Sequence, residues 1–136
     1  MELLYEELMD HYKDPRNYGI LKDFDIKESD SNPLCGDEIL FTIKLEDERI
    51  KDIKFSGAGC AISRSSDSIL TEYVKGKSIN EVLKMSNDDF LKIYGFKPSA
   101  MRVKCALLGF IALKKAILRY LNQPIKKEVE EKNVRS

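Results

Sequence analysis

Residues 39–62 read ILFTIKLEDERIKDIKFSGAGCAI, and this stretch decides the fold. Its first half alternates apolar with more polar residues, the period-2 pattern that predicts a half-buried strand. The polar residues 46–49 predict a turn, and the alternation then resumes as far as Phe55. Together the two runs predict an antiparallel hairpin. Gly57 and Gly59 end the alternation.

A helical spacing follows the hairpin. Four positions are spaced by four, three and four residues, namely Ile62, Ser66, Ile69 and Tyr73. This spacing places them on one face of a helix, which is expected to end near Gly76. Ser78 and Ser86 each precede an acidic residue by three positions, the pattern of a capped helix N-terminus. The sequence therefore predicts two further short helices.

The last helix is predicted to begin near Ser99 and to stop at Pro124, because proline disrupts a helix interior. Apolar residues recur along it at every third or fourth position, namely Val103, Leu107, Phe110, Leu113, Ile117 and Leu121. From Ile125 onward the chain is mostly Lys, Glu and Asn, with little to bury. Residues 125–136 are therefore predicted to form a flexible tail.

Residues 3–12, on the N-terminal side of the hairpin, carry apolar side chains at helical spacing. Asp14-Pro15 is expected to end this helix, because the residue before a proline is disfavoured in the helical region. Residues 24–27 are expected to form a short strand. Residues 29–33, Ser-Asp-Ser-Asn-Pro, have the composition of a turn.

The order of strands first and helices after predicts the α+β class, with helices packed on one face of a small antiparallel sheet. The 136 residues suffice for one domain, predicted over residues 1–124. Basic and acidic residues number 23 each, so no net charge draws the chain to nucleic acid or to an anionic membrane. No apolar run approaches the roughly 20 residues that a membrane helix needs.

The chain has three cysteines, and each lies at a junction between predicted elements. Cys35 precedes the first hairpin strand, Cys60 begins a helix, and Cys105 lies in the first turns of the last helix. An odd number of cysteines without a secretion signal indicates a reducing compartment, here predicted to be the cytoplasm. Helix N-termini stabilise thiolates, the form that binds metal. One such cysteine is more often a small buried side chain, but three together favour function.

Asp37 lies two residues after Cys35 and thus on the same side of an extended chain. Three thiolates and one carboxylate can complete a tetrahedral zinc site. They can equally hold a 2Fe–2S cluster, which ordinarily takes four cysteines. Carboxylate oxygen suits cluster iron less well than thiolate does, which favours a temporary cluster. Taken alone, Asp37 is better explained as a solvated carboxylate at a strand edge.

Four segments carry a family resemblance, namely residues 9–17 (MDHYKDPRN), 32–37 (NPLCGD), 57–63 (GAGCAIS) and 102–106 (RVKCA). In this order they resemble the IscU/SufU family, NifU N-terminal-like scaffold proteins of iron–sulfur assembly. The resemblance runs from about Leu4 to Leu121.

The resemblance implies a scaffold, not an enzyme, that accepts sulfur from a cysteine desulfurase and transiently holds a 2Fe–2S cluster. Acceptor apoproteins or carrier proteins would receive the cluster. It also implies that Cys35, Asp37, Cys60 and Cys105 are the ligands. Cys105 or Cys35 would accept the persulfide sulfur.

The sequence mixes two branches of this family. Lys104 stands where the cluster-scaffold branch usually has histidine, and this matches the SufU-like branch. Residues 75–103 lack the insertion that the SufU-like branch usually carries. Residues 96–100 stand where the scaffold branch has its chaperone motif, Leu-Pro-Pro-Val-Lys. The favoured function is the cluster scaffold; the alternatives are a SufU-like zinc-dependent sulfur-transfer protein and, more weakly, a purely structural zinc domain.

Other polar residues are interpreted as structural or left open. His11, the single histidine, is expected at a helix surface or a partner contact rather than on a metal. No histidine base is evident for the serines of the helix after Cys60, so serine catalysis is not expected; they are Ser63, Ser65, Ser66 and Ser68. Lys104 either contacts a cluster or is solvated.

Overall fold

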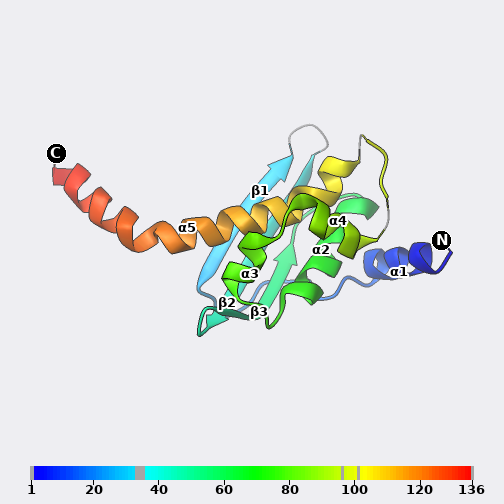
Figure 1. Ribbon diagram of the computed structural model, residues 1–136, viewed down its shortest axis with the longest axis horizontal. Coiled ribbons are helices and arrows are strands. Elements are labelled where there is room, and N and C mark those ends of the chain that lie inside the picture. The colour runs from blue at the N-terminus through cyan, green and yellow to red at the C-terminus, as the bar shows by residue number, and fades with distance from the viewer. Residues whose placement is uncertain (1, 33–35, 96, 101, 136) are drawn as a thin grey trace.

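The computed structural model describes residues 2–32, 36–95, 97–100 and 102–135, and for residues 2–4 and 123–135 it describes the backbone alone (Figure 1). One helix precedes three strands, and four helices follow them. The elements are α1 (Glu2–Lys13), β1 (Ile26–Asn32), β2 (Asp37–Glu46), β3 (Arg49–Ser56), α2 (Ala61–Val74), α3 (Ile79–Lys84), α4 (Asn87–Tyr94) and α5 (Val103–Arg135).

The predicted hairpin is present as β2 and β3. Phe41 lies opposite Phe55 across the two strands. The two residues of the turn, Asp47 and Glu48, have φ angles of 53° and 61°. Left-handed residues at both positions give a turn whose twist matches that of the flanking strands, so it closes the hairpin tightly.

β1 corrects two predictions made from composition. It pairs antiparallel with β2 along its whole length, from Ile26 opposite Ile43 to Asn32 opposite Asp37. Residues 29–32 are therefore strand, not turn, and the strand predicted over 24–27 begins two residues later. Polar residues suit this position because β1 is an edge strand, and pairing with β2 overrides the local turn preference.

Helices cover one face of the three-stranded sheet, as predicted. α5 packs on β1 and β2, α2 packs on β3, and α1 packs on α2 (Figure 1). The strands turn alternate side chains toward these helices. The fully buried side chains at the centre of this core include Phe41, Ile43, Ile53, Leu70, Phe110 and Leu113.

The short helices begin at the predicted caps. The Ser78 hydroxyl accepts the Glu81 amide at the start of α3, and Ser86 and Asp89 bond reciprocally at the start of α4. Gly95 ends α4 in the left-handed conformation, with a φ of 82°. The chain is thereby turned toward the start of α5.

α5 differs from its predicted limits at both ends. It begins at Val103, after a turn in which the Ser99 carbonyl accepts the amides of Arg102 and Val103. The predicted stop at Pro124 is wrong, because the helix continues to Arg135. Good helix formers after Pro124 favour this continuation, although the proline leaves the Tyr120 carbonyl without its usual partner. Figure 1 shows the far end of α5 curving away from the sheet, and the predicted flexibility of residues 125–136 stays a prediction.

None of the helices in the described ranges is long and apolar enough to cross a bilayer.

Candidate metal centre

The start of β2 and the N-terminal ends of α2 and α5 meet at one place. Asp37, Cys60 and Cys105 come from these three ends, and their ligand atoms all lie within 4.8 Å of one another. The structure thus brings together three of the four predicted site residues, which lie far apart in the sequence. The fourth, Cys35, lies outside the described residues.

Asp37 is bound to the start of α2. One of its carboxylate oxygens accepts the Cys60 amide at 3.2 Å, and the other lies 3.9 Å from the Cys60 thiol. The residue is only 3% exposed, so it is not a solvated carboxylate at a strand edge. A negative charge at this position is favourable because the N-terminus of a helix carries partial positive charge.

Two glycines allow the chain to approach this closely. A Cβ atom on Gly57, whose φ is 126°, would lie 2.3 Å from the Glu38 carbonyl oxygen. A Cβ atom on Gly59 would lie 2.2 Å from the Ser63 hydroxyl oxygen. The Ala58 carbonyl also accepts the Glu38 amide at 2.7 Å. The loop before Cys60 therefore lies directly against the start of β2.

Each of the two described thiols lies at a helix N-terminus, as predicted. Cys60 is the N-cap residue of α2 and is partly exposed. Cys105 is the third residue of α5 and is 2% exposed. Neither forms a disulfide. Two thiols and a carboxylate in one cluster are a donor set that fits zinc or cluster iron.

Arg102 supplies positive charge beside both thiols. Attraction to Cys60, followed by a hydrogen bond with Cys105, raises the pKa of the Arg102 guanidinium above its ordinary value. The arginine therefore offsets part of the negative charge that thiolates would bring together. Lys104 is exposed, and its contact with a cluster stays a prediction.

Comparison with known sequences agrees with this arrangement. Residues 4–127 match the NifU-like N-terminal domain family. The chain belongs to this family. The resemblance on which the four sequence segments were interpreted is thereby confirmed.

Two relatives of this NifU-like domain are named for different activities, one for sulfur transfer and the other for cluster assembly. The zinc-dependent sulfurtransferase SufU of Bacillus subtilis is 36% identical over 137 residues, which cover 88% of this chain and 92% of the relative. The iron–sulfur cluster assembly scaffold protein IscU 1 of Archaeoglobus fulgidus is 38% identical over 118 residues, which cover 87% of this chain and 76% of the relative.

A solved structure confirms the fold of the NifU-like domain. The crystal structure of a candidate iron–sulfur cluster assembly scaffold protein of the SUF system, from Fervidobacterium islandicum, superposes with a TM-score of 0.72. The two sequences are 29% identical, and the match covers 85% of this chain and 98% of that one.

Asp67 is a residue of the NifU-like domain that sequence reasoning missed. It lies seven residues after Cys60 on α2, it is 4% exposed, and its Oδ1 has no hydrogen-bond partner among the described residues. Burial, followed by repulsion from Asp37, raises the pKa of Asp67 well above its ordinary value. Gly109 makes room for this carboxyl group, since a Cβ atom there would lie 2.1 Å from Oδ1. Its spacing of seven residues from Cys60, about two helical turns, could have predicted that Asp67 lies on the same face of α2 as Cys60.

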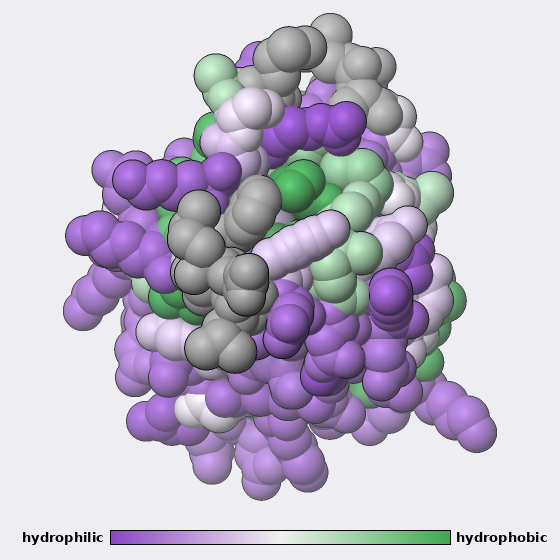
Figure 2. Space-filling model, turned by 90° about the vertical axis from the view of Figure 1, so that its right-hand side faces the viewer, coloured by the Kyte–Doolittle hydropathy of each residue, from purple (hydrophilic) through white to green (hydrophobic). Residues whose placement is uncertain are grey.

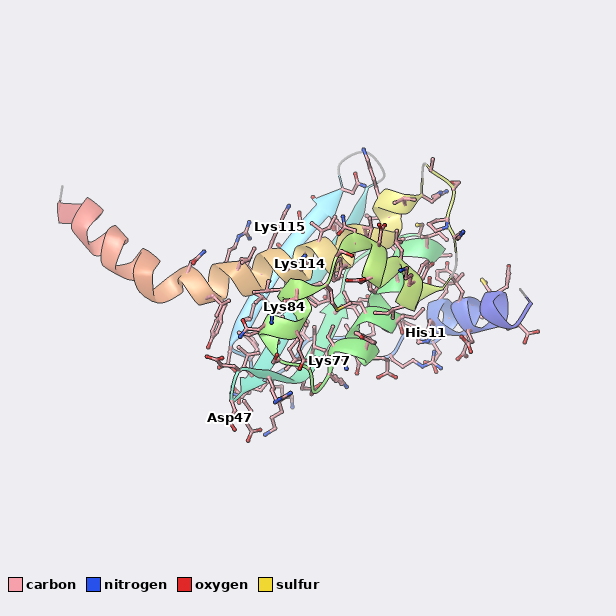
Figure 3. All side chains as sticks on the ribbon, in the orientation of Figure 1. His11, Asp47, Lys77, Lys84, Lys114 and Lys115 are labelled. Atoms are coloured by element: carbon pink, nitrogen blue, oxygen red, sulfur yellow. The ribbon has the colours of Figure 1, made fainter. Side chains whose placement is uncertain are left out.

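The serines of α2 are buried, and three of them bind neighbouring elements. Ser65 bonds to the Tyr94 hydroxyl at 2.9 Å, and Ser66 donates to the Ala106 carbonyl. His11 was expected at a helix surface or a partner contact. In the structure it lies on the side of α1 that faces α2, and its Nδ1 lies 2.6 Å from the Ser68 hydroxyl (Figure 3). Ser68 has no exposed surface, so this pair joins α1 to α2 and offers no accessible nucleophile.

Apolar surface lies close to the candidate centre. Figure 2 looks onto the right-hand side of Figure 1 and shows apolar residues gathered within a mostly hydrophilic surface. A hollow of about 510 Å³ near the start of α5 is lined by Leu91, Pro98 and Val103, together with Lys92 and Lys97.

Proposed function

We propose that this protein is an iron–sulfur cluster assembly scaffold, not an enzyme. It accepts sulfur from a cysteine desulfurase and transiently holds a 2Fe–2S cluster on Cys35, Asp37, Cys60 and Cys105. The observation that carries the proposal is the meeting of two thiols and one carboxylate within 4.8 Å where three elements end. The IscU-named relatives support it. A cytoplasmic location is part of the proposal, because free thiols persist in a reducing compartment.

The residues of this site have different tasks. The cysteines bind cluster iron as thiolates, and Arg102 offsets their charge. Asp37 supplies the oxygen ligand that matches cluster iron least well and is therefore the easiest to displace. The cluster is cargo, so a replaceable ligand favours its delivery to an acceptor apoprotein or a carrier protein.

Sulfur acceptance follows thiol–disulfide exchange chemistry. A thiolate of this chain attacks the outer sulfur of the desulfurase persulfide, the sulfur–sulfur bond breaks, and the desulfurase cysteine leaves as a thiolate. The persulfide is then carried on Cys105 or Cys35. Because Cys105 is 2% exposed, acceptance at Cys105 requires the start of α5 to open toward the desulfurase.

The second candidate is a zinc-dependent sulfur-transfer protein that uses the same four residues as zinc ligands. The match to the SufU-named relative of Bacillus subtilis favours it, as does Lys104. In this alternative Cys35 leaves the zinc and accepts the sulfur. Zinc would then be a resident ion rather than cargo.

Anaerobic purification separates the two candidates. Iron and zinc are measured per chain, and visible absorption is recorded before and after reconstitution with iron and sulfide. A scaffold becomes coloured and holds two irons in each reconstituted cluster. Colourless protein that holds one zinc ion and takes up no iron would establish the alternative.

Serine variants test whether the ligands form one site. Cys35→Ser, Cys60→Ser and Cys105→Ser are each expected to reduce metal retention sharply, because the remaining ligands cannot complete four-coordination. Metal per chain is compared with Ser68→Ala, which alters a buried residue bonded to α1. Normal metal content in two of the three cysteine variants would rule out a shared site.

Labelled cysteine tests the partnership with a desulfurase. In the presence of the organism's own desulfurase, labelled sulfur is expected on this chain, and a reductant should release it. Mass analysis of peptides then identifies Cys105 or Cys35 as the acceptor. The partnership fails if no label transfers under anaerobic conditions.

A further inference from the structure

Ser66 joins the two helices that carry the described thiols. It has no exposed surface, and its hydroxyl donates a hydrogen bond to the Ala106 carbonyl. Ala106 is the residue after Cys105 in the first turns of α5, and Ser66 belongs to the helix that Cys60 caps. The bond therefore ties the body of α2 to the backbone beside Cys105.

The two helices come close together at this bond. Ser66 and Ala106 have small side chains, and both are fully buried. Next to them, the Asp67 carboxyl occupies the space that a side chain at position 109 would fill. Small side chains let the two backbones approach closely here. Because Cys60 and Cys105 lie at the starts of α2 and α5, a shift of one helix relative to the other would change the separation of the two thiols.

The other buried serines of α2 have different partners. Ser63 bonds to the Cys60 carbonyl, and Ser65 bonds within α2 and to Tyr94. Ser68 bonds to His11 and to the amide of Arg16. Of these four serines, Ser66 is the one whose hydrogen bond in the described structure reaches α5.

We propose that Ser66 is a positioning residue that sets the separation of Cys60 and Cys105 through its hydrogen bond to Ala106. The consequence for metal rests on the proposed function, in which these thiols are ligands. Ligands already held in place lose less freedom when an ion binds, so positioning increases affinity. Supporting residues of metal sites typically change affinity by about 10- to 100-fold.

Ser66→Ala and Ser68→Ala form a matched pair. Both remove one hydroxyl from a fully buried serine of α2, and alanine is a better helix former than serine. Zinc affinity is measured by competition with a chelator. Ser66→Ala is expected to weaken zinc binding about tenfold, at the lower end of the range for supporting residues, and Ser68→Ala should leave it unchanged. If the wild type binds zinc, equal affinities of the two variants, or equal losses in both, would overturn the proposal.

A second measurement requires no metal. In a Cys35→Ser background, oxidised glutathione converts the Cys60 and Cys105 thiols to a disulfide. Two electrons and two protons pass to glutathione, which leaves as two thiols. Disulfide formation is expected to be several-fold slower in Ser66→Ala than in Ser68→Ala, because the thiols meet less often.

The two measurements distinguish a failure of the proposed function from a failure of the proposed role of Ser66. If the wild-type chain binds no metal but the disulfide rates differ as expected, the proposed function fails and the role of Ser66 stands. If the wild type binds zinc normally and either zinc affinity or the disulfide rate fails to distinguish Ser66→Ala from Ser68→Ala, the role of Ser66 is wrong and the proposed function is untouched.

Discussion

Asp67 is an acid buried without a hydrogen-bond partner for Oδ1 among the described residues. Because its pKa is raised in the folded chain, the folded state keeps a proton that the unfolded state releases above about pH 4. The free energy of unfolding of metal-free protein therefore falls as the pH rises from that value toward the folded pKa. At neutral pH this carboxyl group opposes folding.

Replacing Asp67 should reverse that effect. Asp67→Ser is expected to stabilise the metal-free protein by about 1–3 kcal/mol at pH 7.5, because a buried titrating carboxyl group is replaced by a hydroxyl that can donate to the carbonyl one turn earlier in α2. The gain should be smaller at pH 5. Urea unfolding at both pH values measures it, with Ser68→Ala as a control that removes a bonded hydroxyl. Equal stabilities of Asp67→Ser and the wild type at both pH values would contradict this prediction.

His11 should produce the opposite dependence on pH. The Ser68 hydroxyl accepts the Arg16 amide at 2.8 Å and also lies 2.6 Å from His11 Nδ1, so the imidazole of His11 is held against α2. Burial, followed by repulsion from Arg16, lowers the pKa of His11 below 6.5. The unfolded chain thus binds this proton more readily, and stability falls as the pH drops below about 6.5.

His11→Gln tests this dependence, because glutamine does not titrate. The free energy of unfolding of the wild type should fall more steeply between pH 7.5 and pH 5.5 than that of His11→Gln. Urea unfolding of metal-free protein at the two pH values gives both slopes. The interpretation of the His11–Ser68 contact is wrong if the slopes agree.

Among the elements, α5 both carries a ligand and extends past the fold. The buried hydrophobic residues of the described core end at Ile117, and the metal group lies at the other end of the helix. Lys115 and Arg119 still pair with Asp30 and Glu28 of β1. Tyr120 is partly buried and packs against the same core, so the described packing of α5 on the fold reaches residue 120.

Removing residues 125–136 should consequently leave the fold and the site intact. A chain ending at residue 124 is expected to keep the unfolding free energy of the full chain within about 0.5 kcal/mol, the range of changes that touch no buried feature. Its zinc affinity should also be unchanged. Urea unfolding and chelator competition measure both, and a loss in either would show that the last turns of α5 contribute to the domain.

Local sequence rules predicted most elements and failed in two. Alternation gave the hairpin, and the serine–acid pairs gave the starts of α3 and α4. Residues 29–32 have turn composition but form strand, because pairing with β2 outweighs local preference. Pro124 does not end α5, because one proline is tolerated where the flanking residues favour helix.

At the scale of the molecule, the site exists because the N-terminal ends of β2, α2 and α5 converge. Their positions in the sequence and the family resemblance predicted Asp37, Cys60 and Cys105 as ligands. The sequence could not predict the distances between their side chains, because the three residues lie far apart along the chain. Packing of α2 and α5 on one face of the sheet sets these distances. Asp67 and the Ser66 bond were not predicted, since both depend on how closely the two helices cross.

The central claim is that Asp37 belongs to a site that holds a cluster temporarily. Asp37→Ala removes the oxygen ligand, whereas Glu38→Ala changes the next residue of β2, which is exposed, and serves as the matched control. Both variants and the wild type are reconstituted anaerobically, and cluster absorbance is followed during transfer to an acceptor apoprotein.

The cluster of Asp37→Ala is expected to last longer and to transfer more slowly than that of the wild type, because the most easily displaced ligand is gone and water or another donor takes its place. Glu38→Ala should behave as the wild type does. If Asp37→Ala instead forms no coloured species and only loses zinc affinity, the site is a zinc site. Unchanged decay and transfer rates in Asp37→Ala would contradict the claim that Asp37 is a ligand at all.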